Sequence, residues 1–132
     1  MHDISENRRK INEFCQQSGK YSADAYEFIT SCVIEQVNNL DRMRHLSARE
    51  VVLGLKQQLV NHFGFLAGDV LKAWNIRQPS DIGVIIFDLI SLNILCAADD
   101  DRQSDFDIDD IVLAEPAKLR KLNSQMEIPQ ID

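Results

Sequence analysis

This chain of 132 residues, of which 45% are hydrophobic and 27% charged, has a globular composition and the length of one domain with a buried core. It has no run of about 20 apolar residues, which a bilayer span needs, and no cationic segment with an apolar core and a cleavage site at its start. Cys15, Cys32 and Cys96 are an odd number of cysteines among apolar neighbours, which indicates buried free thiols in a reducing compartment. We therefore expect a cytoplasmic protein that does not bind membranes.

The formal net charge of −7 is concentrated in one part of the chain. Residues 79–110 carry one basic and nine acidic residues, a net charge of −8, whereas residues 1–78 carry a net charge of +1. An acidic surface of this kind repels phosphate backbones and attracts cationic partners. We therefore expect a binding surface in the acidic part of the chain.

The first two predicted helices follow serine residues that can cap free backbone N–H groups. One runs from Ser5 to a stop at Gly19, and its thin apolar stripe predicts that residues 1–20 form a helix at the edge of the domain. The other follows Ser22 and continues to about residue 40, because apolar side chains recur at helical spacing. We expect this stripe to face the core, and it consists of Tyr26, Ile29, Cys32, Val33, Val37 and Leu40.

A capping box marks the third predicted helix. The Ser47 hydroxyl can accept from the Glu50 N–H while the Glu50 carboxylate accepts from the Ser47 N–H, and Gly64 supplies a stop. A shorter helix over 65–75 follows, and Asn75 at its end is suited to a left-handed backbone conformation. These signals are local, so they predict the helices without reference to the rest of the fold.

The most apolar stretch, Ile82 to Cys96, reads IGVIIFDLISLNILC. A helix that is apolar on nearly every side is buried on nearly every side, so we expect a central buried helix over 79–93. Residues 94–97 then resemble a short strand, and the alternation at 105–108 is typical of a half-buried return strand. Together these two segments predict a β-hairpin at about 94–108.

These elements predict a mainly α-helical fold, a compact helical domain with a C-terminal β-hairpin. Residues 21–113 would form the core domain, and residues 114–132 would form a loosely ordered tail. A helix over 65–75, a turn, a helix over 79–93 and a hairpin have the order of a winged helix-turn-helix. A plain helical bundle with an incidental hairpin fits the same order.

Several segments resemble a family of small uncharacterised bacterial proteins. In that family a Trp-Gly-aliphatic turn precedes an Asp-aromatic-Gly helix start and an acidic Asp-Phe segment. The matching residues here are Trp74-Asn75-Ile76, Asp81-Ile-Gly-Val-Ile-Ile-Phe87, Leu89-Ile90, Asp101 and Asp105-Phe106. The resemblance covers about residues 21–108, and this chain departs from it at Asn75, where glycine is usual. It implies a compact bacterial domain, and no established activity comes with it.

The acidic segment after the central helix is the predicted partner-binding surface. Its seven aspartates are Asp99, Asp100, Asp101, Asp105, Asp107, Asp109 and Asp110. On a solvent-exposed hairpin they would attract a protein partner with a basic surface. We therefore predict a non-enzymatic protein-interaction or regulatory module that uses this acidic hairpin face and needs no cofactor.

Nucleic-acid binding is the first alternative, because of the winged-helix order. The helix in the recognition position offers no cation to base edges, and an acidic wing would repel phosphates. Binding would have to use basic residues of other segments, namely Arg8, Arg9, Lys10, Arg42, Arg44, His45 and Arg49. Such residues are typical of solvated loops and helix ends, so the charge pattern disfavours this class.

Calcium binding is the second alternative. If Asp99 is the first position of a calcium loop, carboxylates fall at alternating positions that include Asp105 and Asp107. However, Ser104 replaces the required glycine, and the twelfth position is Asp110 rather than the longer bidentate glutamate. A strand with a solvated face explains the alternation equally well.

The sequence contains no recognisable catalytic arrangement. Its three histidines are scattered, and it has no nucleophile elbow, phosphate-binding loop or Cys-x-x-Cys pair. Asp81 and Asp88 could form an acid–base pair on one helix face, but capping and an exposed stripe explain them more simply. Four aromatic residues could line a ligand pocket but are more typical of a core: Phe63, Phe65, Trp74 and Phe87.

Overall fold

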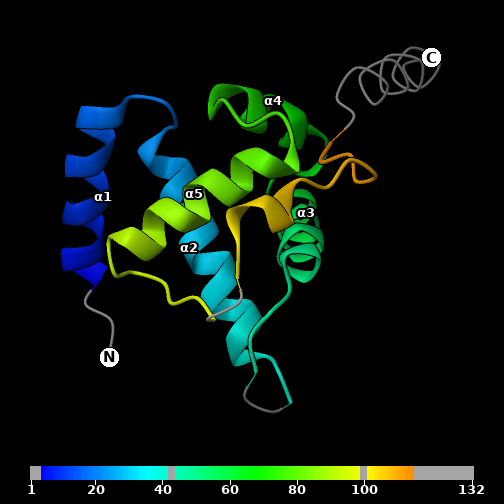
Figure 1. The fold of residues 1–132 in the computed structure, drawn as a ribbon. Helices are drawn as coiled ribbons and strands as arrows, with labels where there is room; N and C mark the ends of the chain where they lie inside the picture. Colours follow the sequence, from blue (N-terminus) through cyan, green and yellow to red (C-terminus); the bar gives the residue numbers. More distant parts are fainter. Residues whose placement is uncertain (1–3, 42–43, 99–100, 115–132) are drawn as a thin grey trace, which may run out of the picture.

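The computed structural model describes residues 4–41, 44–98 and 101–114, and within these ranges the chain is mainly α-helical (Figure 1). The α-helices are α1 (Ile4–Ser18), α2 (Ala23–Asn38), α3 (Ala48–Phe63), α4 (Ala67–Ala73) and α5 (Pro79–Ser91). Two short 3₁₀ helices are η1 (Gly64–Leu66) and η2 (Gln103–Phe106). The predicted mainly α-helical class is therefore confirmed.

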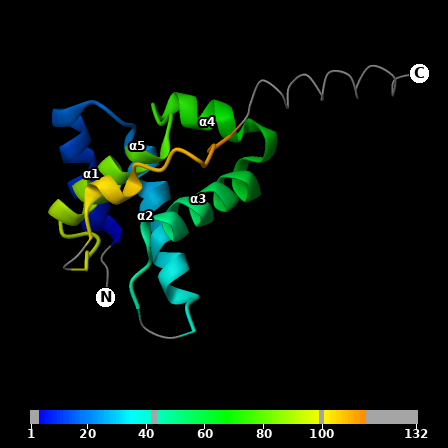
Figure 2. The same cartoon turned by 45° about the vertical axis from the view of Figure 1, so that its right-hand side comes forward.

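Helix α2 contacts the other long helices. It packs against α1, α3 and α5, and α5 crosses it with η2 lying along α5 (Figure 1). In the turned view, α3 extends from its contact with α2 towards α4 (Figure 2). The segment that follows α5 therefore returns across the helices, and η2 contacts both α5 and α3.

The central apolar helix is buried, as the sequence predicts. Ile82, Ile85 and Leu89 of α5 are 0% exposed, and they share one core with fully buried residues of α2 and α3 such as Ile29 and Val52. Full burial of an aliphatic side chain stabilises a fold by about 1.5–3 kcal/mol. The apolar character of α5 therefore reflects its position in the core.

Cap geometry confirms most of the predicted helix ends. Ser22 caps α2, and Ser47 and Glu50 form the predicted capping box of α3. Asn75 follows α4 with a φ of +67°, the left-handed conformation that the sequence predicts there. The first helix differs, because α1 begins at Ile4 and Ser5 lies inside it rather than before it.

The predicted β-hairpin at about 94–108 is wrong, because the described residues of this segment contain no strand and η2 takes its place. Local hydrogen bonds explain the difference. The Asp101 carboxylate accepts from the Ala98 N–H at 2.7 Å, and the Asp105 carboxylate accepts from the Arg102 N–H at 3.1 Å. Aspartate side chains that bind nearby N–H groups favour turns over strands.

Residues 105–108 alternate between exposed and buried side chains, as a return strand would, but they do not form a strand. Phe106 is buried and Ile108 is half-buried, whereas Asp105 and Asp107 are exposed. The described residues after α5 therefore do not form the wing of a winged helix-turn-helix.

The three free cysteines differ in exposure. Cys32 is buried, Cys15 is half-buried and Cys96 is exposed. The prediction of buried thiols is therefore right for Cys32 and wrong for Cys96. Cys96 lies beyond the end of α5 and is exposed although Ile94, two residues before it, is buried.

Buried side chains attach both ends of the described chain to the core. Ile11 of α1 is 2% exposed, and Ile111 and Leu113 are 8% and 3% exposed. The Lys10 ammonium donates to the Leu92 carbonyl oxygen at 3.1 Å, which links α1 to the end of α5. Of the predicted tail at 114–132, all but the first residue lies outside the described residues.

Candidate protein-interaction surface

The predicted acidic surface lies on the segment that carries η2. Asp99 and Asp100 are outside the described residues. The other five aspartates are exposed: Asp101, Asp105, Asp107, Asp109 and Asp110. The same segment is anchored by buried Phe106 and Ile111, which face the core while its carboxylates face solvent. We call the five exposed aspartates, Asp101, Asp105, Asp107, Asp109 and Asp110, the acidic face.

The members of the acidic face differ in what they bind. Asp101 and Asp105 accept from backbone N–H groups of their own segment, at 2.7 and 3.1 Å, so they shape the loop as well as charging it. Asp107 and Asp109 take part in none of the ion pairs found among the described residues. These two carboxylates are therefore the most available to a partner.

Asp110 is engaged within the molecule. Its two carboxylate oxygens accept from the Arg49 guanidinium, at 2.7 Å from Nη2 and 3.2 Å from Nη1. These hydrogen bonds from Arg49 hold the pKa of the Asp110 carboxyl below its usual range. Asp110 therefore already has a partner within the molecule, while its role in binding another protein stays a prediction. The sequence did not indicate the Arg49–Asp110 pair because the two residues are separated by 61 positions in the chain.

An apolar groove with a volume of about 950 Å³ borders the acidic face. Its lining comes from four stretches of the chain: the C-terminal half of α2 and the residues just after it, the segment before α3 with the first turn of α3, α5 with the residues that follow it, and the segment around η2. The apolar side chains include Val33, Val37, Leu46, Phe87, Ile90 and Leu95. Asp41, Asp101, Asp105 and Arg102 also line the groove, so part of the acidic face stands at its edge.

The sequence did not predict this groove. Val37 belongs to the apolar stripe of α2 that we expected to face the core, but it is 46% exposed and lines the groove. Phe87, expected in the core, is half-buried and also lines the groove. Because the lining residues are contributed by four separate segments, no local pattern in the sequence could have shown it.

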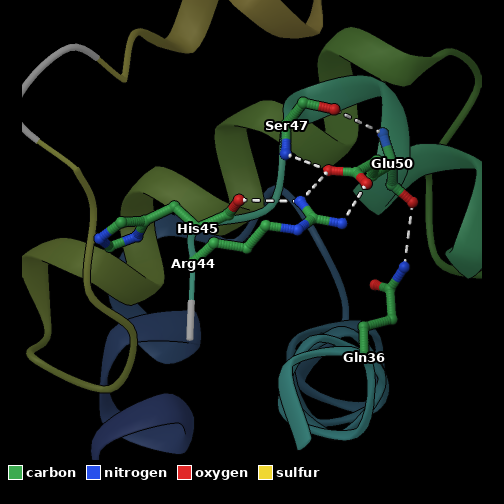
Figure 3. A network of polar contacts seen from close by, with 5 residues as sticks. All are labelled: Gln36, Arg44, His45, Ser47 and Glu50. Atoms are coloured by element: carbon green, nitrogen blue, oxygen red, sulfur yellow. Dashed lines mark hydrogen bonds and ion pairs between the residues drawn. The ribbon is translucent and has the colours of Figure 1, made fainter. Parts of the chain in front are cut away.

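A polar network holds the segment before α3 in place beside the groove (Figure 3). The Arg44 guanidinium donates to both oxygens of the Glu50 carboxylate, at 2.9 and 2.8 Å, and Glu50 also accepts from the Ser47 N–H at 2.8 Å. Hydrogen bonds from Arg44 and then from the Ser47 backbone lower the pKa of Glu50 to about 2. Gln36 of α2 joins the network, because its Nε2 donates to the Glu50 carbonyl oxygen at 3.0 Å.

Two tyrosine–aspartate hydrogen bonds hold α2 and the residue before its cap against α5. Tyr21 Oη donates to Asp81 at 2.6 Å, and Tyr26 Oη donates to Asp88 at 2.7 Å. Burial raises the pKa of both tyrosine hydroxyls, and the bonded carboxylates raise it further, so both stay protonated donors at neutral pH. Asp81 also accepts from the Arg77 N–H at 2.8 Å, as a capping residue does. The prediction that Asp88 lies on an exposed stripe is wrong, since Asp88 is half-buried.

The described basic residues that a nucleic-acid site would use are mostly bound within the molecule. Lys10 binds the carbonyl oxygen of Leu92, and Arg42 lies outside the described residues. The ion pairs are Arg8–Glu27, Arg9–Glu6, Arg9–Glu13, Arg44–Glu50 and Arg49–Asp110. Phosphate binding depends on cations that are available to neutralise phosphates, so this arrangement does not favour the nucleic-acid alternative.

The calcium-loop alternative gains no support from the described residues. Among them, no group of three or more His, Cys, Asp or Glu side chains is placed to hold a metal ion. Asp110 is bound by Arg49, and the Asp105 carboxylate is turned towards its own backbone. The proposed first position, Asp99, lies outside the described residues.

The four aromatic residues do not surround one pocket. Phe63 and Trp74 are half-buried and pack against Phe28, with ring centroids 5.6 and 5.4 Å from it. Phe65 is 56% exposed on η1, and Phe87 lines the groove. The expectation of a buried aromatic core is therefore wrong for Phe65 and only partly met by the other three.

No protein-family model, curated protein or solved structure matches this chain. The resemblance of residues 21–108 to a family of small bacterial proteins therefore stays a prediction. Among the described residues, no helix combines the length and the apolar character that crossing a bilayer requires.

Proposed function

We propose that this chain is a non-enzymatic protein-interaction module that binds a basic surface of a partner protein through its acidic face. The observation that carries the proposal is the position of exposed Asp101 and Asp105 at the edge of an apolar groove, with Asp107 and Asp109 exposed on the same segment. Apolar area buried in such a groove can supply affinity, and the carboxylates can select and orient a cationic partner.

The distribution of charge within the molecule supports the same proposal. The described cations nearest the predicted surface include Arg49, which is paired with Asp110, and Arg44, which is paired with Glu50, whereas Asp107 and Asp109 form no ion pair with a described residue. On residues 101–110, where Arg102 is the one basic residue, the charge available for an external partner is therefore mainly negative. A cationic protein surface fits it, and a phosphate backbone is repelled by it.

The test compares two variants of equal net charge. The first neutralises the acidic face with Asp105→Asn, Asp107→Asn and Asp109→Asn, and the second changes three exposed acidic residues elsewhere with Glu13→Gln, Asp24→Asn and Glu35→Gln. Partner proteins are isolated by their binding to the full wild-type chain and are then purified. The affinity of each purified partner is measured for the wild-type chain and for both variants. We expect the first variant to weaken binding about tenfold and the second to change it by less than about twofold.

A partner that binds both variants as tightly as the wild-type chain would contradict the proposal. The nucleic-acid alternative is tested on the same protein by gel shift with duplex DNA at about 50 and 200 mM salt. We expect no shift at either concentration. A shift at the lower concentration that disappears at the higher one would show phosphate binding instead.

A further inference from the structure

The groove beside the acidic face has the form of a docking site for a helix. Val33 and Val37 lie one turn apart on α2, and Phe87 and Ile90 lie one turn apart on α5, and all four line the groove. Two helices with apolar side chains at helical spacing form a surface into which a third helix can pack its own ridge of side chains. The described residues contain no strand, so an extended peptide could not pair with a sheet edge there.

The charges at the edge of the groove define the flanks of that helix. Asp41, Asp101 and Asp105 line the groove, while the cation Arg44 is already bound by Glu50. Arg102 also lines the groove, and its positive charge balances one of the three negative charges. The remaining charge is negative, so lysine or arginine residues beside an apolar stripe complement this groove and acidic residues there would be repelled.

We infer that the groove binds an amphipathic helix of another protein, with an apolar stripe against α2 and α5 and lysine or arginine residues facing Asp41, Asp101 and Asp105. This inference rests on the proposed function and adds the shape and chemistry of the partner segment. The stripe would supply affinity by burying exposed apolar surface such as that of Val37, and the cations would supply orientation.

The test uses synthetic peptides of defined composition on the full chain. The probe is a fluorescein-labelled helical peptide of about 18 residues, built from leucine and lysine with leucine at the i, i+3, i+4, i+7 spacing. One comparison peptide has the same composition in scrambled order, and another keeps the leucine stripe but replaces lysine with glutamate. Fluorescence anisotropy should show binding of the probe, with both comparison peptides weaker by about tenfold or more.

Two substitutions of nearly equal exposure test the location of binding. Val37 is 46% exposed in the groove, and Leu53 is 47% exposed on α3 and does not line it. The carboxylate added by Val37→Glu attracts the lysine residues of the probe. A loss of affinity in this variant would therefore come from the lost apolar contact and not from charge repulsion. We expect a loss of about tenfold for Val37→Glu and of less than about twofold for Leu53→Glu, with circular dichroism confirming that both fold.

Several outcomes would overturn the inference. The probe could bind wild type, Val37→Glu and Leu53→Glu equally, or bind none of them. It could bind only a full-length variant in which Lys118, Arg120 and Lys121 are serine, which would show that the C-terminal segment of the same chain occupies the groove. A wild-type dimer that Val37→Glu converts to a monomer in sedimentation would identify a second copy of the chain as the occupant.

The inference and the proposed function fail separately. If purified partners depend on the acidic face but are indifferent to Val37→Glu, the proposed function stands and the helix-binding groove does not. If the probe peptide and the partners depend on Val37 but are unaffected by Asp105→Asn, Asp107→Asn and Asp109→Asn, the proposed function is wrong and the helix-binding groove stands.

Discussion

Gly83 of α5 and Phe106 of η2 lie so close together that there is no room for a β-carbon on residue 83. A Cβ placed there would lie 2.6 Å from the Phe106 Cβ and 2.9 Å from its Cγ. Both residues are buried, so the contact sets how closely η2 lies on α5. The position of Asp105 at the edge of the groove follows from this contact, because Asp105 directly precedes Phe106 on η2.

The first prediction is that Gly83→Ala destabilises the fold. Alanine favours the helix by up to about 1 kcal/mol, but overpacking against Phe106 costs about 1–3 kcal/mol, so we expect a lower free energy of unfolding. Urea unfolding monitored by circular dichroism measures the change. Phe106→Ala would keep the Cβ that lies 2.6 Å away, so the control background is Phe106→Gly, which removes both clashing atoms. In that background the same Gly83→Ala change should no longer destabilise the protein. Stabilisation in the wild-type background would show that η2 can move away without cost.

The second prediction compares the two tyrosine–aspartate bonds. Tyr26→Phe leaves the half-buried Asp88 carboxylate without its donor, which should lower the free energy of unfolding by about 1–3 kcal/mol. Tyr21→Phe should cost less, because Asp81 keeps the N–H donors of Arg77 and Gln78 at 2.8 and 3.2 Å. Chemical denaturation of the two variants provides the comparison, and equal losses would argue against this difference.

The third prediction concerns acid stability and the Arg44–Glu50 pair. The pKa of Glu50 in the folded protein is lowered from 4.5 to about 2, first by hydrogen bonds from Arg44. A lowered pKa stabilises the folded state above the ordinary pKa, and this contribution is lost as pH falls from about 4.5 towards 2. Arg44→Gln should therefore lower the melting temperature near neutral pH and match wild type near pH 2. A difference that is independent of pH would assign the effect to packing of Arg44 instead.

The fourth prediction concerns thiol reactivity. Burial, followed by the charge of Glu35, raises the pKa of Cys32 to about 12, and Cys96 is exposed. Because the thiolate is the reactive form, iodoacetamide at about pH 8 should modify Cys96 first and Cys32 only as the protein unfolds. Mass spectrometry of digested samples over time measures both rates. Modification of Cys32 as fast as Cys96 would contradict the burial of Cys32 in α2.

Local chemistry explains why the helices could be predicted from the sequence. The Ser47–Glu50 capping box and the left-handed Asn75 act through backbone groups within a few residues, so their effects are visible in a short stretch of sequence. The burial of α5 could also be predicted, because a helix apolar on nearly every side has no face for solvent. The acidic character of the segment after α5 could be predicted as well, because it follows directly from the residues that the segment contains.

Tertiary structure decided the rest, because it depends on contacts between residues far apart in the chain. Alternating aspartates suggested a strand, but Asp101 and Asp105 bind local N–H groups while Gly83 admits Phe106, and a 3₁₀ turn results. The groove needs α2, α5 and the segments around Leu46 and η2 together, so Val37 could not be recognised as exposed from its spacing. The sequence by itself determined which helices form and where the charge lies; only packing between distant segments decided which side chains are left for a partner.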